Sequence, residues 1–557
     1  MCRVIMYWFV KILGLFSLVL CNVTPSRIVN LTQGPVRGYK DKNLDVFIFY
    51  GIPYATAPTG QDKFKAPLPP PVWSELFEAV DNNIICPQND VTQMIRGSKN
   101  IKEDCLIANV YMPEKNEELL PVLVRFHSGA YAFGHGDISQ SEHLVKSKKI
   151  VAVTFNHRLG AHGFLCLGTK DVPGNAGMKD QVALLRWVKN NIEKFGGNPN
   201  EVTISGHDTG SSSVDILMIS KTAQGLFKRV IAESGANTAA FSVQTDPIKN
   251  AKRYSELFQR ENLDDLNDLE LFYKNLSSTE LNSKNTLARP DSTFLMSPCV
   301  ERDVGQEILL DDNPVNILKS GNFEKRPMLY GFSEIDGQLR LLYLEFWEFW
   351  MNIRFLEFLP ADLQFEDIKE KRKVAEQIKQ FYFGDKTIGK ETVAEFVKYF
   401  TDVMYAYPVL RSVKFQVEAG NNQVFLCMFS KKNFESPAMI FKNTTLVDQC
   451  PKAIGVLNDY WEEIKEDGYG AVDLKPVEEI LPQVVLNFII SGEPVIPGSK
   501  IRWQPVGANW SPYMHIGRTF KLKKSLLKKR ALFWENIYNK YYRFPTPPPA
   551  PAPKDND

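Results

Sequence analysis

The 557-residue sequence carries almost no net charge, with 66 Lys and Arg residues against 65 Asp and Glu residues. Nucleic-acid-binding proteins and proteins held at anionic membranes generally show a basic excess, so the composition favours neither kind of partner. Internal repeats are absent, and so is any zinc-ligand or phosphate-loop spacing. The sequence therefore predicts no metal, no cofactor and no nucleic-acid partner.

Long hydrophobic runs are also lacking, apart from one at the N-terminus. Arg3 and Lys11 precede the apolar run Ile12–Leu20, which is short for a membrane span. A basic region followed by a short apolar region is typical of a secretory signal peptide, predicted over residues 1–23, with an uncleaved N-terminal anchor as the alternative. The later run Leu481–Ile490 is too brief to cross a membrane. We expect a secreted, extracellular protein without a transmembrane anchor.

Five Asn-X-Ser/Thr sequons agree with export, although such triplets also arise by chance. They begin at Asn22, Asn30, Asn275, Asn443 and Asn509. The last four lie in the mature chain and are predicted glycosylation sites.

The sequence contains eight cysteines, of which Cys2 and Cys21 belong to the leader. Cys86 and Cys105 close a short loop and are the best candidates for a disulfide in an oxidising compartment. Such a bridge contributes about 3 kcal/mol. Three others in or beside apolar runs are predicted to be buried thiols: Cys299, Cys427 and Cys450.

Apolar strands alternate with amphipathic helices along the chain. A helix is predicted at Gly177–Phe195, where apolar residues recur at helical spacing. Strands are predicted at Glu103–Tyr111, Pro121–His127, Ile150–Phe155, 202–205, Phe227–Ala232, Pro327–Gly331 and Val424–Phe429. This alternation favours an α/β fold with a mostly parallel sheet covered by helices on both faces.

One domain is predicted over residues 24–543. Within it, Leu339–Leu359 is dense in Leu, Phe and Trp and is predicted to form an apolar helical wall or lid. Residues 544–557 contain six prolines, which exclude a helix or a central strand. We expect a proline-rich, exposed and disordered tail there.

The stretch Val202–Ser211 predicts a strand, a tight turn and a helix. Gly206 and Gly210 bracket the turn, and apolar residues at helical spacing follow it. This is the architecture of a nucleophile elbow, in which the central residue attacks the substrate from a strained backbone position. The central residue here is Asp208, rather than a serine or cysteine.

Several motifs together resemble the type-B carboxylesterase/cholinesterase family of α/β-hydrolases. They are Phe49–Ala55, Glu103–Leu106, Gly174–Gln181, Phe195–Pro199 and Phe533–Glu535. The resemblance extends from about Ile28 to Tyr541. It implies an α/β-hydrolase fold with a helical cap or lid region, and it supports the pairing of Cys86 with Cys105.

Ester hydrolysis in this family needs backbone donors for the oxyanion. The family's oxyanion run corresponds to His127–Ala130 here. The predicted donors are therefore the amides of Gly129 and Ala130, together with the amide of Thr209 after the elbow. None of the three is proline, so all three donors exist. His127 and His207 are predicted to border the pocket.

The acid that orients the base corresponds to Asp336, which precedes Gly337. An ordinary loop aspartate is an equally fitting interpretation of that residue. The base is missing: the family histidine belongs in the loop at residues 447–455, and no histidine occurs between His207 and His515. His515 is predicted to lie at the surface.

Asp208 and the absent histidine together argue against esterase activity. In serine proteases, loss of the nucleophile or of the histidine lowers turnover by about 10⁶. An ionised carboxylate about 4 Å from a developing oxyanion would also raise the barrier by about 4 kcal/mol, roughly a thousandfold in rate. His207 could replace the base only if it lay within hydrogen-bonding distance of its neighbour.

The favoured interpretation is a secreted pseudo-esterase of this family. Its predicted partner is a hydrophobic small-molecule ester, a lipid-like ligand or an extracellular protein. Non-catalytic adhesion members of the family carry a membrane segment, so a freely secreted role fits better. The alternative is a weakly active carboxylic ester hydrolase, or another hydrolase, that uses Asp208 as nucleophile with His207 or Asp336.

Overall fold

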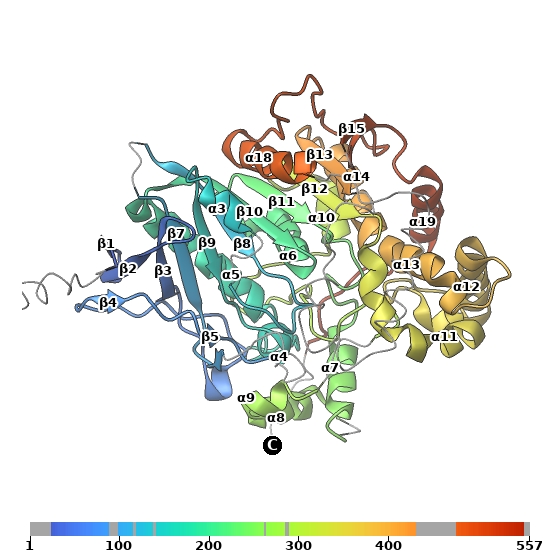
Figure 1. The fold of residues 1–557 in the computed structure, drawn as a ribbon. Coiled ribbons are helices and arrows are strands. Elements are labelled where there is room, and N and C mark those ends of the chain that lie inside the picture. Colours follow the sequence, from blue (N-terminus) through green and yellow to red (C-terminus); the bar gives the residue numbers. More distant parts are fainter. Residues whose placement is uncertain are drawn as a thin grey trace, which may run out of the picture.

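The computed structural model describes residues 24–88, 99–114, 118–136, 141–260, 263–284, 289–429, 475–517 and 519–550. Within these ranges, thirteen strands form one sheet with the spatial order β1-β2-β3-β7-β9-β8-β10-β11-β12-β13-β14-β15, and β4 (Phe77–Glu78) lies beside β2. Figure 1 shows this sheet running through the molecule with helices on either side.

The centre of the sheet is parallel. Its strands are β8 (Leu120–Phe126), β9 (Val151–Phe155), β10 (Gly197–His207), β11 (Arg229–Glu233), β12 (Met328–Ser333), β13 (Val424–Phe429) and β14 (Tyr513–Ile516). Antiparallel strands flank it: β1 (Ser26–Asn30), β2 (Pro35–Asp41), β3 (Val46–Pro53), β7 (Ile107–Met112) and β15 (Phe520–Lys523). The predicted α/β class and mostly parallel sheet are confirmed.

Two layers of helices bury the two faces of the sheet. Successive strand residues point to opposite faces, so Val124 of β8 enters one core and Leu123 the other. The first core contains α5 (Ala176–Asn191) and α6 (Thr209–Ile219), and the second contains α3 (Glu142–Lys146) and α18 (Lys475–Ser491). The predicted helix at Gly177–Phe195 is thus confirmed as α5 with a following 3-10 turn.

Helix α14 (Tyr407–Glu418) packs on the sheet against β12 and β13, and α10 (Pro314–Ser320) packs against α6 and α14. The other helices lie at the right and at the bottom of Figure 1. They are α4 (Gly160–Phe164), α7 (Pro247–Glu256), α8 (Leu266–Asn275), α9 (Ser278–Leu281), α11 (Leu344–Ile353), α12 (Ile368–Phe383), α13 (Val393–Thr401) and α19 (Lys528–Tyr541). The predicted helical segment Leu339–Leu359 is formed by the 3-10 helix η6 (Asp336–Tyr343), α11 and η7 (Phe355–Phe358).

Three details differ from the sequence predictions. Strand β7 begins only at Ile107, because the preceding residues form a turn around Cys105. His515 is half-buried in β14, where its strand pairs with β13, so it does not lie on a surface segment. In the tail, Pro545 and Pro548 are buried, and Pro548 packs beside Gly168 and Arg302, so the described part of the tail is not fully exposed.

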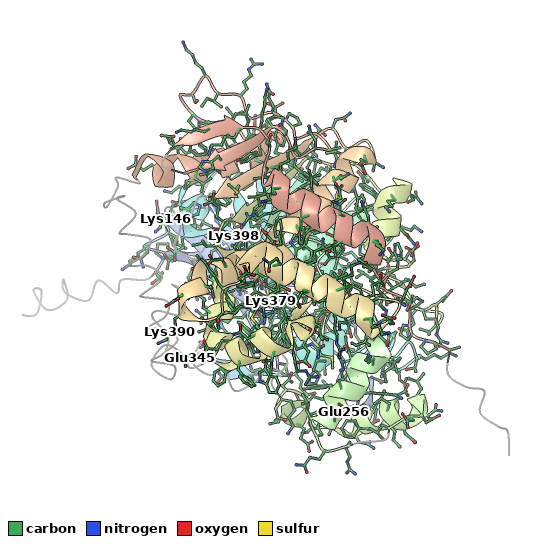
Figure 2. All side chains as sticks on the ribbon, turned by 90° about the vertical axis from the view of Figure 1, so that its right-hand side faces the viewer. Lys146, Glu256, Glu345, Lys379, Lys390 and Lys398 are labelled. Carbon is green, nitrogen blue, oxygen red and sulfur yellow. A yellow bond between two sulfur atoms is a disulfide. The ribbon has the colours of Figure 1, made fainter. Side chains whose placement is uncertain are left out.

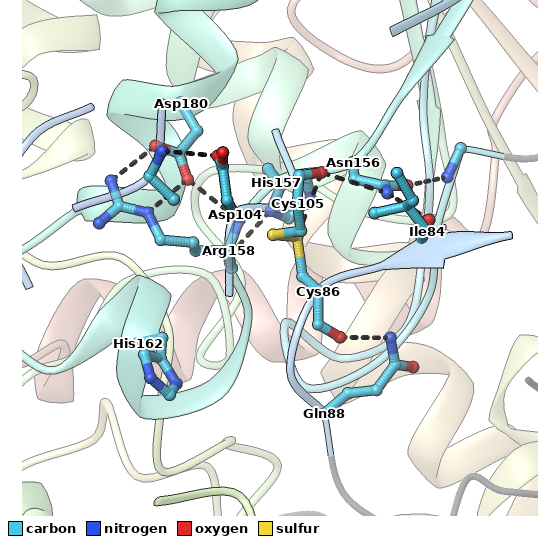
Figure 3. The surroundings of a disulfide bond; sticks show 12 residues. Ile84, Cys86, Gln88, Asp104, Cys105, Asn156, His157, Arg158, His162 and Asp180 are labelled. Carbon is cyan, nitrogen blue, oxygen red and sulfur yellow. Dashed lines mark hydrogen bonds and ion pairs between the residues drawn. A yellow bond between two sulfur atoms is a disulfide. The ribbon is translucent and has the colours of Figure 1, made fainter. Parts of the chain in front are cut away.

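The cysteines form two disulfides within the described residues. The predicted Cys86–Cys105 bridge is present, and Asn156 Nδ2 holds the surrounding loop by donating to Ile84 O at 2.8 Å and Cys105 O at 3.3 Å (Figure 3). The prediction of a buried thiol at Cys299 was wrong, because this residue pairs with Cys166. Cys427 is a buried free thiol, as predicted, and Cys450 lies outside the described residues.

The sequon residues Asn30, Asn275 and Asn509 are exposed, so a glycan could be accommodated at each, while Asn443 lies outside the described ranges. The predicted signal peptide lies outside them as well. Across the part of the chain that the structure describes, no helix is both long and apolar enough to cross a membrane.

Candidate functional site

The elbow places Asp208 between β10 and α6 in a strained backbone conformation. Its φ and ψ angles are +53° and −119°, which L residues rarely adopt. The turn needs its glycines: a Cβ on Gly206 would lie 2.2 Å from Gly210 C, and one on Gly210 would lie 2.5 Å from Phe126 O. The sequence-predicted strand, turn and helix are therefore held together by close backbone packing.

The oxyanion loop follows β8 and keeps a left-handed backbone. Gly129, Ala130 and Tyr131 have φ angles of +125°, +53° and +57°. A Cβ on Gly129 would lie 1.9 Å from Phe133 O, so this position requires glycine. A left-handed conformation at Ala130 costs about 1–2 kcal/mol, which the surrounding loop must offset.

The three predicted amide donors converge on the Asp208 carboxylate itself. The amides of Thr209, Ala130 and Gly129 lie near enough to this carboxylate to lower its pKa, although among the described residues none of the three forms a hydrogen bond of ordinary length and angle with it. Burial has the larger, opposite effect, so the net pKa of Asp208 is raised above its ordinary value. The contacts are loose, and the side-chain hydrogen bond from Thr209 Oγ1 to Asp208 Oδ2 is 3.5 Å long. The carboxylate thus points at the donors that the family uses for an oxyanion.

Asp336 lies near the elbow, at the start of η6 after β12. Its Oδ2 accepts from Ser333 N at 2.8 Å, and the Ser234 side chain also hydrogen-bonds to it. Burial raises the pKa of Asp336 to about 6, with a smaller upward contribution from the charge of Asp208. The structure therefore places Asp208 and Asp336 close enough for the charge of Asp208 to raise the pKa of Asp336.

His207 is half-exposed and lies near both carboxyl groups, since its charge lowers the pKa of Asp208 and the pKa of Asp336. Within the described residues, however, His207 makes no hydrogen bond or ion pair with either of them. A general base must reach the proton that it abstracts, directly or through one water. The geometry therefore does not favour His207 as the base.

Two tyrosines that the sequence reasoning missed also border Asp208. Tyr405, from the π-helical turn η9 (Asp402–Ala406), lies close to Asp208, since its pKa is raised by burial first and by that carboxylate second. Tyr131 is buried beside Ser212 and Ser213 without a well-formed hydrogen bond. The position of Tyr131 directly after the oxyanion run could have identified it, whereas no local pattern marks Tyr405.

His127 lies below the oxyanion loop, where it stacks on His157 with 4.4 Å between ring centroids and 7° between planes. Its Nδ1 lies 2.8 Å from Ser128 O, and burial lowers its pKa well below the ordinary value. Burial likewise lowers the pKa of His157 to about 4. Both rings are therefore neutral near pH 7 and serve as packing groups under the loop.

The hollow beside the oxyanion loop is small. It is too narrow to admit a water molecule. Its lining residues are His127, Ser128, Tyr131, Phe133, His157, Leu159, Thr209 and Ser213. Pockets for drug-sized ligands span about 300–1,000 Å³, so such a ligand would enter this hollow only if the lining side chains moved.

A second buried carboxyl supports the elbow from behind. Asp215, in α6, accepts hydrogen bonds from Tyr330 Oη, from Asn237 N at 2.7 Å and from Ser412 Oγ at 3.1 Å. Burial raises the pKa of Asp215 to about 6. This network ties the helix after the elbow to β12 and α14, so it helps to position the turn.

A metal-dependent site is not formed by the described residues, among which no group of three or more His, Cys, Asp or Glu side chains could hold an ion. The groups around the elbow are carboxyl, phenol and amide groups. They can bind a ligand by hydrogen bonds, whereas the activation of a nucleophile also needs a positioned base.

Comparison with known proteins identifies the group to which this architecture belongs. The sequence model of the carboxylesterase family matches residues 25–534. The chain belongs to the carboxylesterase family. The elbow, the oxyanion loop and Asp336 all lie within the residues that this family model matches.

Relatives of this carboxylesterase-family chain include named esterases. It is 29% identical to the juvenile hormone esterase of Heliothis virescens, over 84% of this chain and 86% of that protein. It is 30% identical to esterase FE4 of Myzus persicae, over 88% of each chain. A solved structure, the juvenile hormone esterase of Manduca sexta with OTFP covalently attached, matches with a TM-score of 0.77 and 25% identity, covering 92% of this chain and 100% of that one. The α/β-hydrolase fold is thereby confirmed.

Proposed function

We propose that this protein is a secreted carboxylesterase-family member without esterase turnover, which binds a hydrophobic ester or lipid-like ligand or an extracellular protein. The observation that carries the proposal is the convergence of the Gly129, Ala130 and Thr209 amides on the Asp208 carboxylate. An esterase keeps these donors free for charge that develops only in the transition state. Here a carboxylate already meets them in the ground state.

The electrostatics of the site add a second reason. The three donors can stabilise an incoming oxyanion only if they leave Asp208, whose negative charge would then repel that oxyanion. Protonation would remove the repulsion, but it would leave a poor nucleophile. Since no described histidine is hydrogen-bonded to Asp208, nothing in the described site supplies the base that the reaction needs.

The charge of the site also favours one class of ligand. Asp208 and Asp336 are both acidic, and the pKa of Asp336 is raised to about 6. Above that pH the pair repels free carboxylates such as fatty acids, whereas a neutral ester is not repelled. The esterase names of the relatives support an ester-like ligand as well. The two disulfides support an oxidising, extracellular location.

The deciding experiment is a hydrolysis assay on the purified full-length protein with short-chain nitrophenyl esters. Wild type, Asp208→Ser and Asp208→Ala should all match the heat-denatured control. Failure of the serine variant to hydrolyse the ester would identify the missing histidine as a separate loss. Family-like turnover by wild type that disappears in Asp208→Ala would overturn the proposal.

The elbow geometry also supports a second candidate function, in which Asp208 acts as a nucleophile and displaces a leaving group from carbon. With an alkyl halide, an Asp208 carboxylate oxygen would attack carbon and halide would leave with the bonding electrons, forming an alkyl ester on the protein. Because no positioned base activates water, this ester should persist. Intact-mass analysis would then show one alkyl group on Asp208, and an unmodified peptide would rule this reaction out.

A further inference from the structure

Helix α11 has apolar side chains on two opposite faces. Leu344, Trp347 and Met351 point inward and are buried. On the other side, Phe346, Phe349, Trp350 and Ile353 are 70%, 61%, 44% and 57% exposed. Their spacing of i, i+3, i+4 and i+7 places them in one stripe along the helix. We call these four residues the α11 stripe.

The stripe is large for a surface that contacts only water. It offers roughly 450 Å² of apolar surface, taking about 200 Å² for a fully exposed side chain of this size. Single exposed apolar residues are ordinary, whereas the largest contiguous patch on a typical monomer, about 300–600 Å², often has a function. We therefore expect the α11 stripe to contact a partner.

The stripe is also held rigidly. Asn352 Nδ2 donates to Ile388 O at 2.8 Å, and Lys379 Nζ donates to Asn352 O at 3.0 Å, which joins α11 to α12 and to the turn after it. Figure 2 views the side of the molecule that carries these helices, with Lys379, Lys390 and Glu345 labelled. Phe349 and Trp350 meet edge to face at 5.3 Å. A surface fixed in this way is preorganised for binding.

A second copy of the chain does not suit this surface. In a symmetric contact, Glu345 and Glu348 of one copy would approach the same residues of the other copy, and like charges that face each other are unfavourable. A lipid surface needs no such charge match, since an apolar helix face with Phe and Trp inserts at the boundary between headgroups and acyl chains. We propose that the α11 stripe attaches the protein to a lipid–water interface.

The charges beside the stripe indicate which lipids it prefers. Glu345 and Glu348 lie on the same helix, and Arg354 at its end is paired with Glu357 at 2.6 Å. Membrane helices that recognise anionic lipids carry an excess of Lys and Arg instead. The stripe is therefore matched to a zwitterionic or neutral surface, where attachment depends on apolar insertion.

The position of α11 near Asp336 suggests what lipid attachment would achieve. The attachment itself does not depend on the proposed function. The helix follows Asp336 directly through η6, and Trp347 on its inner face stacks on Tyr343 at 4.7 Å. Lipid attachment would bring the Asp336 side of the protein close to a source of apolar ligands.

Flotation of the purified full-length protein with phosphatidylcholine vesicles tests this inference. Wild type should float with the vesicles, and the triple variant Phe346→Ser, Phe349→Ser, Trp350→Ser should lose at least tenfold in partitioning. Adding phosphatidylserine should change the binding by less than twofold. Trp350→Phe should keep the binding, since it preserves an aromatic ring.

A matched control uses exposed apolar residues elsewhere. Val72 lies in the loop before β4 and Leu271 lies in α8, and both are exposed. The variants Val72→Ser and Leu271→Ser should float like wild type. Equal flotation of the triple variant, or flotation that requires phosphatidylserine, would overturn the inference. So would sedimentation showing a wild-type dimer that the triple variant loses, because the stripe would then join two copies. None of these readouts depends on ester hydrolysis, so they are independent of the proposed function.

Discussion

Asp180 and Asp208 are two carboxylates in the same domain with very different surroundings. Asp180 is buried with Arg158, which donates to its two oxygens at 2.9 Å and 2.6 Å and adds a backbone N–H at 3.0 Å (Figure 3). Asp208 faces three amides and a tyrosine, and within the described residues it has no ion-pair partner. The Arg158–Asp180 pair is thus matched in charge, whereas the Asp208 carboxylate is stabilised only by nearby amides and by the charge of His207.

This difference indicates which parts of the domain the fold depends on. We expect the fold to depend on the glycines of the elbow turn, the Arg158–Asp180 pair and the disulfides. We expect it to depend little on the side chain at the centre of the elbow. Variants in the two regions should therefore differ strongly in their free energy of unfolding.

The largest expected effect comes from the disulfide between Cys166 and Cys299. Their sequence separation is 133 residues, so replacing both by serine should lower the free energy of unfolding by about 5 kcal/mol. The Cys86–Cys105 pair, separated by 19 residues, should cost about 3 kcal/mol by the same argument. Denaturant unfolding of the two double variants measures the difference, and an inverted order would contradict it.

The next effect concerns the buried ion pair. Asp180→Asn leaves the Arg158 guanidinium buried without its counter-charge, which should destabilise the protein by about 3–5 kcal/mol. Urea unfolding at neutral pH gives the value. A control is Glu307→Gln, which breaks an exposed pair with Arg186 and should change stability by less than about 1 kcal/mol. Equal losses in the two variants would show that burial is not the cause.

Asp336 differs from the paired carboxylates in how its ionisation changes the free energy of unfolding with pH. Its folded-state pKa is raised to about 6, so the folded state binds this proton more tightly than the unfolded chain. The resulting penalty is complete above pH 6 and disappears as the pH falls from about 6 to about 4. Asp336→Asn should remove it, gaining up to about 3 kcal/mol at pH 7.5 relative to the same comparison at pH 4. Unfolding of both proteins at the two pH values measures this, and a pH-independent difference would contradict it.

The smallest expected effect is at the elbow centre. Asp208→Asn removes a partly buried, unpaired charge and keeps the side-chain shape, so stability should rise by less than about 1 kcal/mol. Gly206→Ala in the same turn should cost more than about 3 kcal/mol, because its Cβ meets Gly210 backbone. Thermal unfolding of both variants tests the contrast. A large loss in Asp208→Asn would mean that the carboxylate itself holds the turn.

Much of the fold and part of the site could be predicted from the sequence. Strand β13 was predicted with its observed bounds, and α5 and the elbow follow from periodicity and from the glycines at Gly206 and Gly210. These features are local, since strand and helix spacing and tight turns depend on neighbouring residues. The absence of histidine between His207 and His515 likewise needs no structure.

Other features were decided only by tertiary structure. The pairing of Cys166 with Cys299, the approach of Tyr405 to Asp208 and the exposure of the α11 stripe all depend on contacts between distant segments. Apolar spacing in α11 fits a buried wall as well as a surface stripe, because periodicity does not say what lies opposite a face. The sequence by itself determined that an aspartate replaces the nucleophile. Only the fold, by bringing β8 beside β10, directed the oxyanion amides at that aspartate.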